Sequence, residues 1–542
     1  MGSGASKDLL RRYFPYALIL AFSAVLRFYH MMNPLTFPGY SGTLGKNGAD
    51  EGIFLMTSKL VANGSKMYVD INTHQGPLFT FIFQLLGGDP LAIRFMTVII
   101  GLLGIAGLMM LSRTSASRRV AIISSILLSL NFIFFKVSRQ ASFDLYCTVL
   151  LTFGFLAVIK YYQLQSRSKG EQKQWMAYLS LVIAGILFSM AAMSKLFGVI
   201  PILSVGAYML IEYVRERRKG KVGNEGFLHL ITLVVFTALP TLGIMSIYGL
   251  GDTFSGMFLS NLDRPTIPLD RRAGTLLKFL AFASIPLILS IVTIVKELKD
   301  RTVQLMLVWM VPLSIFILIQ SAIWDHYFIM VLPPMCFLAG MGYDLLWRRY
   351  SSRDPDRHGG RIDWKGTADG PDLPLVLGRA LIASSLIFMI ISAGAITGLV
   401  MISDKQVEQD VAEDVSSLTD PSSYIISGDP IIGVYADRLQ PPEATNIAIV
   451  RSPPLLDRDL INITCSYEVV VVVFTYNLAN YDLYLDFIQE NYEFHKAYTW
   501  TGETSEIMDE IEITMDTFSI YVKEDDLDME QARESFFNEN PP

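Results

Sequence analysis

Long apolar runs recur along the first three quarters of the chain, with short polar segments between them. Eleven runs approach or exceed the roughly 20 residues that a helix needs to cross a bilayer. They lie at 13–32, 90–112, 118–136, 143–163, 175–192, 196–214, 227–249, 274–296, 303–321, 326–346 and 377–401. A shorter apolar stretch, 76–88, predicts an interfacial or re-entrant segment. The pattern predicts a polytopic α-helical membrane protein with about 11 to 13 transmembrane helices.

Basic residues collect in alternate loops, which gives the chain a predicted orientation. Short cytoplasmic loops carry an excess of Lys and Arg. The clusters are Lys7/Arg11/Arg12, Arg113/Arg118/Arg119, Arg167/Lys169/Lys173, Arg215/Arg217/Arg218/Lys219/Lys221, Lys296/Lys299/Arg301 and Arg348/Arg349/Arg353. An odd number of spans puts all six on one side. We therefore expect a cytoplasmic N-terminus, an extracytoplasmic C-terminal part, and outer segments at 33–75, 137–143, 250–273, 322–326 and the turn around Ser194.

Composition agrees with a membrane protein and separates two parts of the chain. Hydrophobic residues make up 51% of the sequence and charged residues 18%. From residue 403 onward there are 29 acidic and seven basic residues, a net charge of −22, which leaves +15 for the rest. We therefore divide the chain into a membrane domain, 1–402, and an acidic domain, 403–542. Such an acidic domain argues against a nucleic-acid partner and is typical of a solvated outer face.

The acidic domain has the texture of a small α/β fold. Strands are predicted at Tyr424 to Ser427, Val469 to Phe474 and Phe518 to Val522, and helices at 405–417 and 482–491. The run VVVVVF predicts a strand buried on both faces, and hence a partly parallel sheet. The acidic stretch Glu524 to Glu530 is interpreted as exposed surface.

Several cations break the charge pattern by lying on the predicted outer side. They are Arg94, Arg139, Lys195, Arg264, Arg271 and Arg272. Lys195 is the most informative, because a tight turn between two spans places its ammonium at the membrane boundary, where an anion is the natural partner. The alternative is that each side chain simply reaches toward the interface from a helix end.

Acidic residues and a histidine fall on the same side. Asp50 and Glu51 lie in the first outer loop, Asp144 begins a span, and His326 opens another. The simplest interpretation of Asp50 is a helix cap for residues 51–62, closed by Gly64. The convergence of these carboxylates, the outer-side cations such as Lys195 and the histidine in one outward-facing cavity would instead suit an anionic, lipid-linked substrate.

Several motifs, taken in order, resemble those of GT-C membrane glycosyltransferases, in particular the branch of protein O-mannosyltransferases and the aminoarabinose transferase of lipid A. Residues 49–94, ADEGIFLMTSKLVANGSKMYVDINTHQGPLFTFIFQLLGGDPLAIR, resemble its D-E, G-x-x-x-Y-x-D, H-x-P-P-L and a-x-R pattern. SRQASFD (138–144), GILFSMAAMSKLFGVIP (185–201), NLDRP (261–265) and WDHYFIMVLPP (324–334) resemble later motifs. Gly76 and Phe54 depart from the pattern, which often has proline and tyrosine there. The tryptophan-rich acidic motif of oligosaccharyltransferases is not evident after residue 403, which argues against glycan transfer to asparagine.

The resemblance implies an inverting sugar transfer from a polyprenyl- or dolichyl-phosphate donor to a hydroxyl of a protein, lipid or glycan. It assigns Asp50 as the base, with Glu51 and Asp144 as further catalytic residues. Lys195, Arg139, Arg94, Arg264 and His326 would bind the donor phosphate, and Tyr68, Asp70 and His74 would position substrate. No tightly bound organic cofactor is implied, and Glu51 or Asp144 could hold a divalent metal. The expected location is the cell membrane, with the endoplasmic reticulum as the alternative.

Two other functions compete with this interpretation. A transporter of a lipid or small anion would usually show paired internal repeats and charges near the membrane midplane. Neither is evident here. An assembly scaffold with an outer interaction module would account for the C-terminal domain but would leave the outer charged motifs without a purpose.

Overall fold

The structure is a computed structural model that describes residues 3–33, 48–167, 171–220, 225–261, 265–351, 373–401, 407–447, 455–475, 477–479, 481–499, 504–505 and 517–540. Within these ranges, nine helices are long and apolar enough to cross a membrane. They are α4 (Pro90–Ser115), α7 (Phe143–Arg167), α8 (Glu171–Ala192), α9 (Val199–Arg218), α10 (Glu225–Ile247), α12 (Leu269–Glu297), α13 (Arg301–Ile319), α14 (Leu332–Ser351, extended by the 3₁₀ helix η3, Asp325–Val331) and α15 (Leu373–Met401).

Two predicted spans differ from the observed helices. The apolar part of α1 (Ser3–Phe28) covers only Tyr13–Phe28, and the helix ends four residues before the predicted limit. The run 118–136 is two helices, α5 (Arg118–Ser129) and α6 (Phe132–Val137). Its break has a local cause, because the side chain of Asn131 accepts hydrogen bonds from the amides of Ile133 and Phe134 and so starts a new helix.

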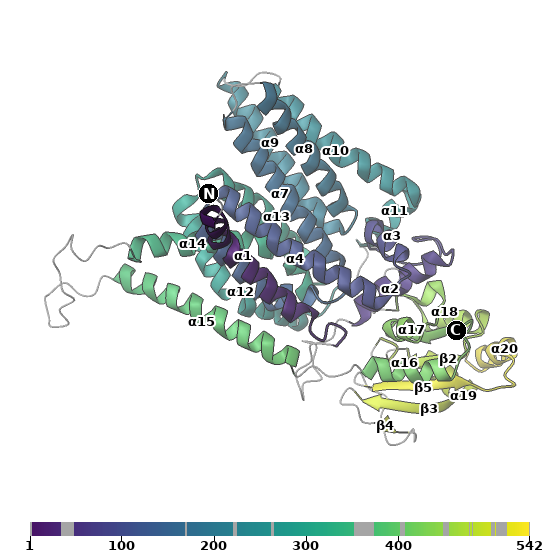
Figure 1. Ribbon diagram of the computed structural model, residues 1–542. Helices are drawn as coiled ribbons and strands as arrows, with labels where there is room; N and C mark the ends of the chain where they lie inside the picture. The colour runs from purple at the N-terminus through teal and green to yellow at the C-terminus, as the bar shows by residue number, and fades with distance from the viewer. Residues whose placement is uncertain are drawn as a thin grey trace.

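Short elements line the end of the helical body that faces the C-terminal domain. They include α2 (Gly48–Ala62), α3 (Pro77–Leu85), η1 (Leu196–Gly198), α11 (Leu250–Met257) and η2 (Leu259–Asn261). The nine-residue α3 is not among the candidate spans, as the sequence predicted for 76–88. In Figure 1 the N-terminus and the C-terminal domain lie at opposite ends of the helical body, with α2 between the body and that domain.

The C-terminal domain is built on one five-stranded sheet of order β1-β2-β5-β3-β4. The strands are β1 (Ile425–Ser427), β2 (Val471–Phe474), β3 (Tyr492–Thr499), β4 (Thr504–Ser505) and β5 (Thr517–Lys523). Among the described strands, β1–β2 is the parallel pair, and β2–β5, β5–β3 and β3–β4 are antiparallel. Every residue of β2 is buried, as its apolar run predicted.

Helices and a 3₁₀ turn surround this sheet. They are α16 (Val407–Ser417), α17 (Ile431–Tyr435), η4 (Pro442–Ala444), α18 (Asp457–Ser466), α19 (Asp482–Asn491) and α20 (Met529–Glu539). The acidic stretch before α20 is largely exposed, as expected, and Asp528 caps the helix by accepting from two of its amides. The domain contacts the helical body mainly through α17, which packs on α2.

Candidate functional site

Five separate elements bring charged side chains together at the end of the body beside the C-terminal domain. Asp50 lies in the first turn of α2, Asp144 in the first turn of α7, and Lys195 in the turn between α8 and η1. Asp325 and His326 begin η3, and Lys136 lies in the last turn of α6. The sequence had predicted that Asp50, Asp144, Lys195 and His326 converge, and the structure does bring these four side chains together.

His326 lies at the centre of this cluster. Its Nε2 is 3.5 Å from Asp50 Oδ2 and 3.9 Å from Asp144 Oδ2, and its Nδ1 is 3.7 Å from Asp325 Oδ1. The carboxylate of Asp325 is 3.5 Å from Lys136 Nζ. Carboxylates therefore flank both ring nitrogens of His326.

Lys195 joins the cluster through Asp144. Its Nζ lies 3.3 Å from Asp144 Oδ2, donates to Gln75 Oε1 at 3.3 Å, and sits 5.2 Å from the centre of the Tyr327 ring. Asp144 is buried, and its Oδ1 has no hydrogen-bond partner among the described residues. One buried carboxylate oxygen of Asp144 thus makes no hydrogen bond to the residues that the structure describes.

The lysine turn is held by close backbone packing against α3. The Leu78 amide donates to the Met193 carbonyl at 3.2 Å. A Cβ atom at Gly76 would lie 2.1 Å from that same carbonyl oxygen, so any larger residue, proline included, would push the turn away. This contact explains one departure from the family pattern. The other has a packing role, because the Phe54 ring stacks on Phe143 at 4.3 Å, directly before Asp144.

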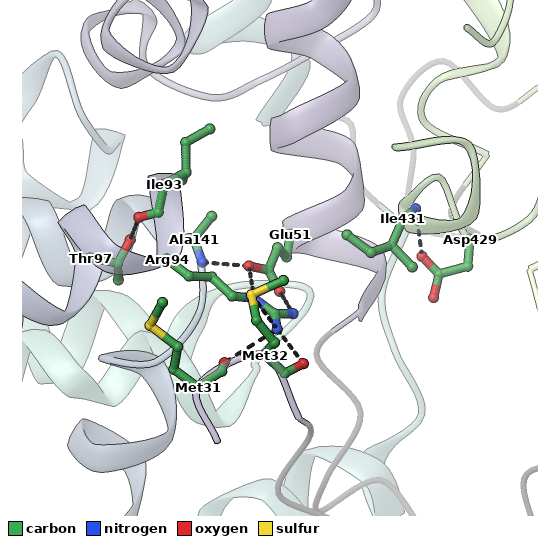
Figure 2. A network of polar contacts seen from close by, with 9 residues as sticks. All are labelled: Met31, Met32, Glu51, Ile93, Arg94, Thr97, Ala141, Asp429 and Ile431. Atoms are coloured by element: carbon green, nitrogen blue, oxygen red, sulfur yellow. Dashed lines mark hydrogen bonds and ion pairs between the residues drawn. The ribbon is translucent and has the colours of Figure 1, made fainter. Parts of the chain in front are cut away.

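Glu51 and Arg94 form a separate buried pair. Arg94 Nε donates to Glu51 Oε1 at 2.8 Å and Nη2 donates to Oε2 at 2.7 Å. Oε1 also accepts from the Ala141 amide, and Arg94 Nη1 donates to the Met32 carbonyl at 2.7 Å. Figure 2 shows this network, with the loop of Met31 and Met32 on one side. Both charges are fully engaged, so the pair joins α2, α4 and the segment before α7.

Arg139 lies near this pair, together with Arg27, a residue that the motifs did not indicate. Arg139 Nη1 and Nη2 donate to the Leu26 and His30 carbonyls, while Arg139 Nε is buried and has no hydrogen-bond partner in the part of the chain that the structure describes. Arg27 is fully buried and donates to Ser138 Oγ at 2.7 Å. Both guanidinium groups lie over the Phe135 ring, at 5.0 Å for Arg27 and 5.6 Å for Arg139.

The residues predicted to position substrate lie in the segment between α2 and α3. The Tyr68 hydroxyl donates to the Gln75 carbonyl at 2.5 Å, and Asp70 accepts from the Lys66 amide at 2.7 Å. His74 Nε2 is 3.0 Å from the Gln75 side-chain nitrogen. Tyr68 and Asp70 thereby shape the segment that presents Gln75 to Lys195. Arg264 lies outside the described residues.

A divalent metal at Glu51 or Asp144 receives no support from the local chemistry. Among the described residues, no group of three or more His, Cys, Asp or Glu side chains could hold a metal ion. Both Glu51 oxygens already bind Arg94. The open oxygen of Asp144 is one ligand atom, short of the several that such an ion takes. The metal stays a prediction.

The chain is similar to a known protein family in part of its sequence and to solved structures in its fold. Residues 77–243 match the family of dolichyl-phosphate-mannose-protein mannosyltransferases. ArnT from Cupriavidus metallidurans bound to undecaprenyl phosphate is similar in structure, with a TM-score of 0.61 over 97% of this chain and 99% of ArnT, at 13% identity. The chain has a GT-C fold. An oligosaccharyltransferase from Archaeoglobus fulgidus tethered to an acceptor peptide shares this fold, with a TM-score of 0.53 over 96% of this chain and 77% of its own, at 13% identity.

The GT-C fold confirms the resemblance that the motifs indicated and makes the chain a multi-pass membrane protein. The family match and the fold together indicate a membrane glycosyltransferase. No curated protein matches the chain in sequence. The motifs contained most of the cluster, although no role was assigned to Asp325 or Gln75 within them, and neither Lys136 nor the buried Arg27 was indicated. Lys136 lay inside an apolar run, and the sequence carried no signal that a distant carboxylate faces it.

Proposed function

We propose that the chain is an inverting glycosyltransferase that moves a sugar from a polyprenyl-phosphate donor to an acceptor hydroxyl at the outer membrane surface. The observation that carries the proposal is the cluster of Asp50, His326, Asp144 and Lys195, drawn from four elements to one end of the helical body. Charges gathered near one end favour chemistry at the surface over transport through the midplane.

Asp50 is the side chain best placed to be the base. Its side chain is 52% exposed, whereas those of Glu51 and Asp144 are 2% exposed each. An acceptor hydroxyl must reach the base before its proton can be taken. Asp50 would accept that proton while the hydroxyl oxygen bonds to the anomeric carbon and the bond from that carbon to the phosphate oxygen breaks.

The leaving polyprenyl phosphate needs cations in a poorly hydrated place. Lys195 is our first choice, with His326, Arg139 and Arg264 as further ligands, because fixed cations stabilise charge that develops in the transition state. Arg94 serves differently, since its bidentate bond to Glu51 makes it the anchor of α2. Tyr68, Asp70 and His74 would position substrate, and the polyprenyl tail would lie against exposed apolar side chains of the spans.

The proposed partners follow from this chemistry. The donor is a polyprenyl- or dolichyl-phosphate sugar, and the acceptor is a hydroxyl of a protein, a lipid or a glycan. The reaction would take place on the extracytoplasmic side of the cell membrane, or in the lumen of the endoplasmic reticulum. The C-terminal domain, which packs on α2 next to Asp50, would form part of the acceptor's approach.

The test is sugar transfer by the purified protein. Labelled polyprenyl-phosphate sugars are incubated with extracted membrane acceptors, and wild type is compared with Asp50→Asn. Loss of a positioned base should slow transfer by roughly a hundredfold to ten-thousandfold. Asp270→Asn, an exposed acid at the start of α12, is the matched control and should transfer at the wild-type rate. The anomeric configuration of the product, read by NMR, should be opposite to that of the donor.

Two outcomes would contradict the proposal. Asp50→Asn transferring as fast as wild type would remove Asp50 as the base. Movement of intact donor across sealed vesicles, with no sugar released or transferred, would favour a transporter.

A further inference from the structure

Lys136 and Asp325 extend the polar cluster behind His326, away from Asp50. Lys136 is 5% exposed and belongs to α6, an otherwise apolar helix. Its ammonium pairs with Asp325 Oδ2, and Asp325 Oδ1 accepts from the backbone amide of His326 at 2.9 Å. Two contacts that do not involve the imidazole therefore aim the Asp325 carboxylate at the ring.

The ring of His326 faces acceptors on both edges. A neutral imidazole carries one N–H and one lone pair. A lone pair on Nδ1 would face Asp325, and a lone pair on Nε2 would face Asp50 and Asp144. Either arrangement sets a lone pair against a carboxylate. The imidazolium, with a proton on each nitrogen, is the form that all three carboxylates favour.

Among the side chains that these ion pairs join, the charges balance with this form. Its carboxylates are Asp50, Asp144 and Asp325, and its other cations are Lys136 and Lys195. Buried charges persist where they are paired. With a neutral ring, Asp50 and Asp144 would lie near each other with one cation too few, and two such carboxylates tend to share a proton. A protonated Asp50 cannot act as a base.

We propose that Asp325, which Lys136 orients, is a positioning residue that holds His326 as an imidazolium, and that this imidazolium keeps Asp50 ionised and oriented for proton transfer. The part that concerns Asp50 rests on the proposed function. The other titratable groups around the ring are Lys195, Tyr327, whose ring meets His326 edge to face at 4.7 Å, and Lys278 of α12 near Lys136.

The charge of the ring can be measured directly. Protein labelled with ¹⁵N in its six histidines is studied by NMR, and the signals of His326 are assigned by their loss in His326→Gln. Both nitrogens of His326 should be protonated at about pH 7 in wild type. Asp325→Asn should give a neutral ring at that pH, because an uncharged amide does not stabilise the second proton of the His326 imidazolium. Asp325→Glu should restore the charged ring, and Asp270→Asn should leave it unchanged.

Transfer activity supplies a second readout. Wild type should keep its rate between about pH 6 and pH 8, where an unperturbed histidine would titrate. In Asp325→Asn, the rate should fall as pH rises, by up to about tenfold for each pH unit above the transition of the ring. A merely structural defect would lower the rate at every pH and leave the profile unchanged in shape. Thermal unfolding shows whether each variant is folded.

A neutral His326 ring in wild type would overturn the proposal. So would an Asp325→Asn profile that superimposes on the wild-type profile after scaling. If wild type transfers no sugar from any polyprenyl-phosphate donor, the proposed function fails. The NMR measurement still decides the charge of the ring, so the two failures are distinguishable.

Discussion

At the scale of single residues, burial assigns different roles to acids that look alike in the sequence. Asp50 and Glu51 are neighbours, yet one is half exposed and the other is buried against Arg94. The motifs identified both residues and predicted that Asp50 meets Lys195 and His326. The sequence could not show that Arg94 is engaged by Glu51, because helical spacing does not reveal which distant side chain a buried charge faces.

The Glu51–Arg94 pair predicts a large stability effect. Glu51→Ala leaves a buried guanidinium without its carboxylate and should lower the free energy of unfolding by about 3–5 kcal/mol. Glu51→Ala combined with Arg94→Met removes both charges and should recover much of that loss. Thermal or denaturant unfolding of the purified variants measures the effect. Losses that simply add in the double variant would show that the two side chains do not stabilise each other.

At the scale of elements, α2 connects the site to the C-terminal domain. A Cβ atom at Gly52 would lie 2.4 Å from the backbone nitrogen of Ile431 in α17. On the same helix, Lys59 Nζ is 2.6 Å from Asp437 Oδ1, and this hydrogen bond lowers the pKa of Asp437 below its ordinary value. Because Gly52 follows Asp50 and Glu51 closely in the chain, the packing of α17 helps to fix where the proposed base points.

Gly52→Ala should therefore be damaging even though alanine favours helices. Backbone atoms of α17 must shift, which costs typically about 1–3 kcal/mol. Gly243→Ala, near the C-terminal end of α10 where an added Cβ meets no neighbour, is the matched control and should be neutral or stabilising by up to about 1 kcal/mol. Unfolding temperature and transfer rate are measured for both variants. Equal behaviour of the two would show that α17 does not restrict α2.

The elements themselves were predicted unevenly. The residues 482–491 formed a helix as expected, and the three predicted strands appear within a few residues of their limits. β3 and the helices α18 and α20 were not predicted, because their polar residues obscure the apolar spacing. The break at Asn131 was missed for a related reason: one capping side chain interrupts a run that hydropathy averages over.

At the scale of the whole molecule, charge and architecture agree. The acidic C-terminal domain and the N-terminus lie at opposite ends of the helical body (Figure 1). In the predicted topology, the basic clusters lie on the same side of the membrane as the N-terminus. The positive-inside rule predicts that the site and the C-terminal domain share the outer face. That arrangement is what a transfer to an extracytoplasmic acceptor requires.

This topology can be tested with introduced cysteines, because Cys147, Cys336 and Cys465 are all buried and should react little in the folded protein. Val69→Cys, before α3, and Gln489→Cys, in α19, lie on the predicted outer face, whereas Arg218→Cys ends α9 on the predicted cytoplasmic face. A membrane-impermeant maleimide added to sealed vesicles should modify the first two together and Arg218→Cys only from the opposite side. Whichever way the protein is oriented in the vesicles, the reagent should modify either Val69→Cys and Gln489→Cys or Arg218→Cys, but not both groups. The result therefore does not depend on which membrane holds the protein. Modification of Val69→Cys and Arg218→Cys from the same side would mean that the charge pattern does not determine the topology, and that Asp50 does not face an outer acceptor.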